Sequence, residues 1–384
     1  MARVLFLTWD GAGNQPPAAA LAAALNRQGH TVVFAGNEHQ RHYFAKRGFA
    51  FVLLRRAAGR WRQEAQECMF AVKREAVWAC SEHIDDVPQL MAQENCGAVV
   101  IDCLMFGALA AAEKLRLPAA AFIHSAPGAL MPPGGPFEAQ LFAAVNQLRE
   151  ESGLSSLRSL WEAWAPFPAI SNSIRALDPF ASRAPRSFQY CGPMPEQEPA
   201  RAKWTSFWPS ADGRPLVLVS FSTGPYWDQS PRILKTLHAL ADGPYRVLVT
   251  AGQARIDPAM VSSNAVVVER APHDDILPNA ALTITHAGHG TVLASLSHGV
   301  PLLCLPNPVA DQPILAQQVE ALGCGLSLED AVAPAAIKSA VERMLHDRSF
   351  EMKCLSLAKQ IAETPGVSFA VSYLESALGL SGIN

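Results

Sequence analysis

The stretch that decides the fold is Thr285 to Thr291, which reads Thr-His-Ala-Gly-His-Gly-Thr. The apolar run before it, 282–285, predicts a strand, and the run after it, 292–298, predicts a helix. Gly288 and Gly290 let the backbone approach a ligand closely. A helix N-terminus offers free N–H groups and partial positive charge, which favour phosphate. The turn therefore predicts a phosphate site at the carboxyl end of a parallel strand.

The same alternation of strand and helix runs through both halves of the chain. It predicts parallel sheets joined by right-handed crossovers, hence an α/β fold. The 384 residues exceed one ordinary core, so we expect two Rossmann-like domains. The predicted parts are a first domain at 1–192, a Pro-rich linker at 193–214, a second domain at 215–362 and a final helix at 363–384. The expected strands cover 4–8, 30–35, 98–101, 119–124, 216–220, 246–250, 265–269, 282–285 and 301–305, and the expected helices include 17–28, 106–115 and 292–298.

Composition excludes several classes of protein. The net charge of -3 provides no basic field for nucleic acid. No apolar run approaches the ~20 residues that span a bilayer, and the N-terminus is typical of a strand rather than a signal peptide. The eight cysteines form no Cys-x-x-Cys motif, which indicates buried thiols in a reducing compartment. We therefore expect a cytoplasmic protein with no nucleic-acid partner, no stable membrane insertion and no metal site.

Two further polar clusters follow predicted strands of the second half. Ser222 and Thr223 come directly after the strand at 216–220 and could reach the same phosphate group. Asp311 and Gln312 follow the strand at 301–305, and a carboxylate beside an amide suits the vicinal hydroxyls of a sugar. The sequence thus predicts a site for a phosphorylated sugar derivative at one edge of the second sheet.

The segment from Ala271 to Gly325 resembles the donor-binding signature of family 1 glycosyltransferases with the GT-B fold, in their bacterial natural-product branch. The resemblance rests on Ala-Pro-His-Asp-Asp-Ile-Leu-Pro, the turn at 285–291, His-Gly-Val-Pro-Leu-Leu-Cys-Leu-Pro and Ala-Asp-Gln-Pro. It implies two facing Rossmann-like domains, a C-terminal helix that crosses back to the first, and no metal or other cofactor. A dTDP-sugar or UDP-sugar would bind the second domain as co-substrate, and the acceptor would bind the first.

The resemblance also implies roles for individual residues. Arg270 and His273 would face the nucleotide base, and Asp311 with Gln312 would bind the sugar hydroxyls. His286, Gly290 and Thr291 would hold the diphosphate, assisted by Ser222. The predicted nucleotide-sugar site also includes Thr223, Gly288 and His289.

The sequence departs from this family at the catalytic base. The family reads Gly-His-x-x-Pro after its first strand, whereas residues 13–17 read Gly-Asn-Gln-Pro-Pro, and asparagine cannot accept a proton. Asn14 thus stands in place of the histidine, while Asp102 stands where the family has the aspartate that orients it. Asp102 is our favoured replacement base, directly or through a water that Asn14 positions; the other candidates are Asp10, His124 and Glu138, the last expected at the surface.

The missing histidine is also consistent with two different functions. A phenol needs little help to ionise, and a ring carbon beside a phenolate is nucleophilic, so the chain could be an aryl C-glycosyltransferase. Alternatively, it could be a non-catalytic partner protein that only binds nucleotide sugars. A UDP-N-acetylglucosamine epimerase of the same fold is less favoured, because the chain lacks a carboxylate-rich active site.

The first half is rich in aromatic and methionine residues that would border the acceptor site. Such surfaces suit a flat apolar molecule. We expect inverting, metal-independent transfer of a hexose to an aromatic or polyketide-like acceptor; a homodimer or an auxiliary protein stays possible. The residues considered are Trp61, Phe70, Trp78, Met105, Phe106, Met131, Phe137, Trp161 and Trp164.

Overall fold

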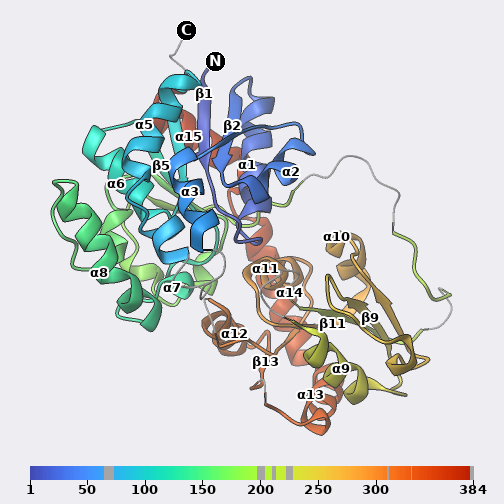
Figure 1. Cartoon of the computed structure of the whole chain (residues 1–384). Helices are drawn as coiled ribbons and strands as arrows, with labels where there is room; N and C mark the ends of the chain where they lie inside the picture. The colour runs from blue at the N-terminus through green and yellow to red at the C-terminus, as the bar shows by residue number, and fades with distance from the viewer. Residues whose placement is uncertain are drawn as a thin grey trace. The chain divides into compact units, whose positions relative to one another are not determined.

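The computed structural model describes residues 1–64, 73–196, 204–209, 213–221, 228–308, 311–329 and 331–380. It divides into two compact units. Unit 1 comprises Met1–Gln197 together with Pro365–Asn384, and unit 2 comprises Glu198–Thr364. Each unit is an α/β structure built on one parallel sheet, which confirms the predicted fold class (Figure 1).

Unit 1 contains a parallel sheet with the strand order β3-β2-β1-β4-β5-β6-β7. Successive side chains of β1 enter two separate cores: Val4 and Phe6 lie in one, and Leu5 and Leu7 in the other. Both faces of the sheet are therefore covered, which is why the apolar runs of the sequence do not alternate with polar residues. The strands are β1 (Arg3–Leu7), β2 (Thr31–Gly36), β3 (Ala50–Leu53), β4 (Ala98–Asp102), β5 (Ala119–Ile123), β6 (Ala169–Ser171) and β7 (Phe188–Tyr190).

The helices of unit 1 cover the two faces of this sheet. α1 begins with two prolines at its first positions, where a missing N–H costs nothing. The helices are α1 (Gln15–Arg27), α2 (Glu38–Ala45), α3 (Arg55–Glu64), η1 (Arg74–Trp78), α5 (His83–Gln93), α6 (Phe106–Leu115), α7 (Pro127–Leu130), α8 (Pro136–Glu151), η2 (Leu160–Ala163), η3 (Arg175–Leu177), η4 (Ala181–Arg183) and α15 (Gly366–Leu378).

Unit 2 repeats the architecture with the strand order β10-β9-β8-β11-β12-β13. Its strands are β8 (Leu216–Ser220), β9 (Arg246–Thr250), β10 (Ala265–Val268), β11 (Ala280–Thr285), β12 (Leu302–Cys304) and β13 (Gly325–Ser327). Its helices are α9 (Ser230–Leu240), η6 (Pro258–Met260), α10 (His273–Ile276), η7 (Leu277–Asn279), α11 (His289–Ser297), α12 (Gln312–Ala321), α13 (Pro334–His346) and α14 (Arg348–Ala362).

The last helix, α15, packs on α1 of unit 1, although the whole of unit 2 separates the two in the sequence (Figure 1). Ala370, Val371 and Leu374 are buried in the same core as the apolar face of α1. Glu375 also pairs with Nε2 of His30 at 3.0 Å. The chain thus returns to its first domain to complete one face of that sheet.

The structure differs from the predicted elements in detail. α11 begins at His289, three residues earlier than expected, so Gly290 and Thr291 belong to its first turn. The strands β3, β6, β7 and β13 were not predicted, because runs of three or four residues give no clear period. The seven cysteines within the described ranges are free and buried, as expected. No helix in the part of the chain that the structure describes is long and apolar enough to span a bilayer.

Candidate functional site

Three loops of unit 2 leave the same edge of its sheet. β11 lies between β8 and β12, with Thr285 opposite Ser220 on one side and Cys304 on the other. Because these strands are parallel, the segments that follow them start side by side. This edge is the place where open parallel sheets bind ligands.

The turn after β11 has the shape of an anion site at a helix N-terminus. Gly288 is the N-cap of α11, and a side chain there would collide with the ring of His286, whose Nε2 lies 2.5 Å from the Cβ position. A Cβ on Gly290 would meet no atom within 4 Å, so the space above the first turn is open. Free N–H groups of this turn therefore have room to receive a ligand oxygen.

His286 is buried and neutral at physiological pH. Burial, followed by the positive charge of Arg232, lowers the pKa of His286 to about 4. A neutral imidazole has a single N–H, which here donates to the backbone of Ser220, and it adds no charge that would hold a released product. His289 is also buried, and Thr291 is half-buried in the same turn.

Arg232, which sequence reasoning missed, links the loops of this edge. It lies in the first turn of α9, is buried, and its Nη1 donates to Oδ1 of Asn307 at 2.6 Å. The side-chain oxygen of Gln312 in turn accepts from the backbone N–H and the Nδ2 of Asn307 at 3.0 and 2.9 Å. The only signal in the sequence was a basic residue near the start of the helix that follows β8, and many such residues are merely exposed to solvent. A buried cation here raises the positive potential around the turn.

The other predicted donor residues are placed less closely. Asp311 is the N-cap residue of α12 and is half-buried beside Gln312. His273 opens α10, whereas Arg270 is exposed and lies 3.9 Å from its neighbour Glu269. Ser222 and Thr223 lie outside the described residues. Their roles, like those of the other donor residues, stay predictions.

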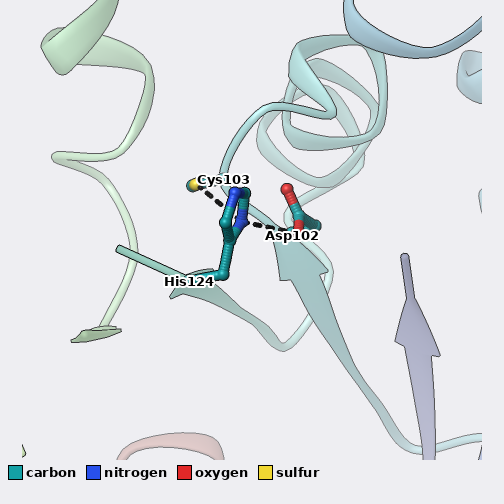
Figure 2. Close-up of side chains that lie close together, drawn as sticks. All are labelled: Asp102, Cys103 and His124. Carbon is teal, nitrogen blue, oxygen red and sulfur yellow. Dashed lines mark hydrogen bonds and ion pairs between the residues drawn. The ribbon is translucent and has the colours of Figure 1, made fainter. Parts of the chain in front are cut away.

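Unit 1 brings together three of the five residues considered for catalysis. Asp102 ends β4, His124 follows β5, and Asn14 caps α1 after β1, so all three lie where adjacent strands end. The Nδ1 atom of His124 lies 2.9 Å from Oδ2 of Asp102 (Figure 2). Cys103 lies on the other side of that nitrogen, with its sulfur at 3.7 Å.

The Asp102 carboxylate is buried and surrounded by donors. Oδ1 accepts from the indole N–H of Trp9 and from the backbone N–H of Leu104, each at 3.1 Å. Oδ2 accepts from Nδ2 of Asn14 at 3.0 Å and from His124. Four donors occupy the acceptor positions of one carboxylate. Asp, Cys and His are metal-ligand types, but this arrangement is a hydrogen-bonded ion pair in which the carboxylate is already satisfied.

Charge stabilises the ionised form of both partners. Burial opposes the charge on Asp102, but the His124 imidazolium and the hydrogen bonds outweigh it and lower the pKa of Asp102. Burial likewise opposes protonation of His124, but the Asp102 carboxylate outweighs it and raises the pKa of His124 well above its ordinary value. Burial raises the pKa of Cys103, so its thiol stays protonated. The pair is therefore an imidazolium–carboxylate pair at neutral pH.

Asn14 donates a hydrogen bond to the carboxylate and does not act as a base in place of a histidine. Its Nδ2 lies within 3.1 Å of Thr8 Oγ1, Trp9 O and Asp102 Oδ2. The side chain is 1% exposed. Three oxygens around one nitrogen fix the orientation of the amide, so Asn14 is a donor to the cluster.

The remaining proposed bases, Asp10 and Glu138, have other surroundings. Asp10 is half-buried, and its charge acts on Lys73, whose ammonium lies 4.9 Å from the Trp9 ring. Glu138 was expected at the surface, and that prediction was wrong: it is 5% exposed. Its carboxylate accepts from the backbone N–H groups of Gly134, just before α8, and of Leu160, the first residue of η2.

A small pocket, hereafter the cavity of unit 1, lies beside Trp9. Its wall is mostly apolar, with side chains from α3, η1 and the start of α6, and its polar members include Gln40 and His83. Nε2 of Gln40 and Nδ1 of His83 are buried there with no hydrogen-bond partner among the described residues. Burial lowers the pKa of His83 to about 4, so its ring is neutral. Sequence reasoning assigned His83 no role, because a histidine in a helix gives no signal of its own.

The predicted acceptor-facing aromatics have several fates. Met105 lines the cavity, and Trp78 packs edge-on against Trp9. Trp61 and Phe70 fall among residues whose side chains are not described. The others belong to the core or pack against it: Phe106, Met131, Phe137, Trp161 and Trp164.

Known proteins match both halves of the chain. Residues 234–376 match the family model of the erythromycin biosynthesis protein CIII-like C-terminal domain. The demethyllactenocin mycarosyltransferase of Streptomyces fradiae is 26% identical over 413 residues, covering 98% of this chain and 87% of that protein. The NDP-glycosyltransferase YjiC of Bacillus licheniformis is 29% identical over 215 residues, which cover 54% of this chain and only 53% of the relative. The chain thus matches about half the length of that Bacillus protein.

Solved structures share the architecture of the chain. The glycosyltransferase of kitacinnamycin has a TM-score of 0.78 at 18% identity, covering 98% of this chain and 99% of its own. VinC, solved in complex with dTDP, has a TM-score of 0.70 at 17% identity, covering 98% and 100%. The spinosyn rhamnosyltransferase SpnG, solved with spinosyn aglycone, has a TM-score of 0.72 at 19% identity, covering 98% and 100%. The chain therefore has the GT-B fold.

Proposed function

We propose that this chain, which carries an EryCIII-like C-terminal domain within the GT-B fold, transfers a hexose from a dTDP-sugar or UDP-sugar to an apolar small molecule. The observation that carries the proposal is the turn at 285–291 at the ligand-binding edge of unit 2. The anomeric carbon would invert, because the acceptor oxygen attacks opposite the leaving diphosphate in a single displacement. The reaction would need no metal, since the turn and its surroundings supply positive potential.

The donor half of the proposal rests on electrostatics. The leaving diphosphate gains negative charge as its bond to the sugar breaks, and preorganised donors stabilise that charge best. The first turn of α11 offers N–H groups, and Arg232 is a nearby cation. Gln312 lies at the same edge for the sugar hydroxyls, its position fixed by Asn307.

The acceptor half rests on the cavity in unit 1. Its lining is mostly apolar, with Leu54, Val77 and Met105 among its members, which suits an apolar part of an acceptor. The two buried polar atoms there, Nε2 of Gln40 and Nδ1 of His83, suit a polar substituent of that acceptor. This favours a hydroxylated aromatic or polyketide-like acceptor over a simple sugar.

The first experiment is a melting-temperature shift with dTDP, UDP and GDP, each well above its expected dissociation constant. A ligand at ~100 times its dissociation constant adds ~2.7 kcal/mol of stability, a shift of a few degrees. A selective shift with dTDP would favour deoxysugar donors, and one with UDP would favour UDP-glucose. If no nucleotide shifts the transition, the turn does not hold a diphosphate and the proposal fails.

Product analysis then separates the chemistry from its alternatives. Incubation of the shifting donor with a hydroxylated aromatic should give an acid-labile O-glycoside. An acid-stable product would identify a C-glycosyltransferase, the case that the loss of a histidine at Asn14 keeps open. Nucleotide binding without transfer or donor hydrolysis would identify a non-catalytic partner protein instead.

A further inference from the structure

The two ring nitrogens of His124 have different surroundings. Nδ1 is 2.9 Å from the Asp102 carboxylate, an acceptor, so Nδ1 carries the hydrogen. In the neutral ring Nε2 then holds a lone pair. No partner for Nε2 occurs among the described residues, and this atom is not among the buried unsatisfied ones. The tautomer that the carboxylate selects is the one that can accept a proton from outside.

Exposure decides which member of the pair can touch a substrate. The side chain of His124 is 11% exposed, whereas that of Asp102 is 2% exposed. Asp102 also has its oxygens filled by four donors, and a fifth group could reach it only by displacing one. A substrate hydroxyl can therefore meet the imidazole but not the carboxylate.

The surroundings place this imidazole beside the acceptor cavity. The His124 ring packs edge-on against Trp9 at 6.3 Å between centroids, and Trp9 itself lines the cavity. Trp9 also donates its indole N–H to Asp102. One indole thus joins the cavity wall, the carboxylate and the imidazole, so an acceptor held in the cavity lies near the pair.

We infer that His124 is the general base of the transfer and that Asp102 and Asn14 position it, an inference that rests on the proposed function. The acceptor O–H gives its proton to Nε2 while its oxygen bonds to the anomeric carbon. The bond between that carbon and the diphosphate oxygen breaks, and the diphosphate leaves with the electron pair. Asp102 stabilises the imidazolium that forms, and Asn14 holds Asp102 by its Nδ2 hydrogen bond.

The test removes the imidazole at position 124 and then introduces one at position 14, since both residues contact Oδ2 of Asp102. The probes are 1-naphthol and 1-naphthalenemethanol with dTDP-glucose and UDP-glucose. His124→Gln should lower turnover by about 10² to 10⁴-fold. The loss should be larger for the alcohol, whose proton is held more tightly than that of the phenol. Because Asn14 also lies 3.0 Å from Asp102 Oδ2, adding Asn14→His to His124→Gln should recover at least about tenfold of the loss.

The matched control is His30→Gln. His30 is also a buried histidine paired with a carboxylate in unit 1, through Glu375 at 3.0 Å, but it precedes β2 at the opposite sheet edge. This variant should keep full turnover. Nucleotide-induced melting shifts should be unchanged in all variants, because the nucleotide is proposed to bind unit 2.

The pH dependence of turnover shows whether Asp102 positions and polarises the base or only stabilises the fold. Turnover should fall with decreasing pH through a limb above pH 6.5, since the base must be deprotonated and Asp102 raises the pKa of His124. The groups that face His124 are Asp102 and the protonated Cys103 thiol. Asp102→Asn should lower the rate and move that limb to lower pH. Full turnover in folded His124→Gln, or an unmoved limb in Asp102→Asn, overturns the inference, whereas a wild-type chain inactive on both probes contradicts the proposed function.

Discussion

At position 14 the chain carries an amide that cannot accept a proton but makes three contacts to oxygen atoms. Histidine at the same place would donate one hydrogen bond and keep a second nitrogen for chemistry. Asn14 instead holds Asp102, and the imidazole enters the cluster from the end of β5. The chain thus has a carboxylate–imidazole pair, but its imidazole follows β5 instead of β1.

The buried pair predicts a pH-dependent contribution to stability. Because Asp102 raises the pKa of His124 in the folded chain, the pair contributes fully below the ordinary pKa of 6.5. That contribution is lost as pH rises through the higher folded value. At pH 6, His124→Gln should cost about 3 kcal/mol, since it leaves a buried carboxylate with one donor fewer.

Urea unfolding of the wild-type protein and of His124→Gln between pH 6 and pH 10 measures this effect. The stability difference between wild type and His124→Gln should shrink steadily with increasing pH. A constant difference across that range would contradict the imidazolium form. His30→Gln serves again as the comparison, because His30 pairs with Glu375 and does not contact Asp102.

The pairing of His124 with Asp102 could not be chosen from the sequence alone. The resemblance pointed to Asp102, and three other candidate bases stood beside it. Which of them reaches Asp102 depends on sheet order, because β4 and β5 are neighbours although the residues are 22 positions apart in number. Burial of Glu138 likewise follows from backbone donors that no periodicity reveals.

At the scale of elements, the turn before α11 combines two glycines with different constraints. A side chain at Gly288 would strike the His286 ring, whereas one at Gly290 would point into open space. Folding alone therefore explains glycine at 288 but gives no reason for it at 290. Close approach of a ligand is the physical reason that the proposed function supplies for Gly290.

Gly290→Ala should separate folding from binding. Alanine in the first turn of α11 should leave stability unchanged or raise it by ~0.5–1 kcal/mol, because the helix loses a flexible residue. The added methyl group should weaken dTDP or UDP binding by about tenfold or more. Melting curves without nucleotide and calorimetric titration with it measure the two effects; unchanged affinity would place the diphosphate elsewhere.

The cavity of unit 1 gives a second prediction at this scale. Ala57, in α3, is buried and lines the cavity, so Ala57→Phe should fill part of it. We expect KM for 1-naphthol to rise about tenfold or more, while nucleotide binding in unit 2 stays unchanged. Equal KM values in a folded variant would mean that the acceptor binds outside this cavity. The melting temperature checks that overpacking, which costs ~1–3 kcal/mol, has not unfolded unit 1.

At the scale of the whole molecule, the chain crosses between its units twice. The sequence predicted most longer strands to within about two residues, because uninterrupted Val, Ile and Leu runs are typical of a sheet covered on both faces. Arg232 and the cavity polar atoms could not be predicted, since each depends on residues brought together from separate elements. The packing of α15 in the core of unit 1 likewise depends on contacts between segments far apart in the sequence.

This return of the chain predicts that a substitution near the C-terminus acts on the N-terminal unit. Leu374 is 0% exposed and lies in the core that α15 shares with Leu21 and Leu25 of α1. Leu374→Ala should destabilise unit 1 by about 2–5 kcal/mol through lost burial and the cavity that remains. Unit 2, at residues 198–364, contains no part of that core.

Urea unfolding followed by tryptophan fluorescence and by nucleotide binding measures this prediction. The fluorescence transition of unit 1, which contains Trp9, Trp161 and Trp164, should move to lower urea in Leu374→Ala. Nucleotide affinity before that transition should be unchanged. Leu355→Ala is the control, because Leu355 of α14 is 46% exposed and its truncation should cost less than ~0.5 kcal/mol. Equal transitions in the two variants would show that α15 contributes little to the stability of unit 1.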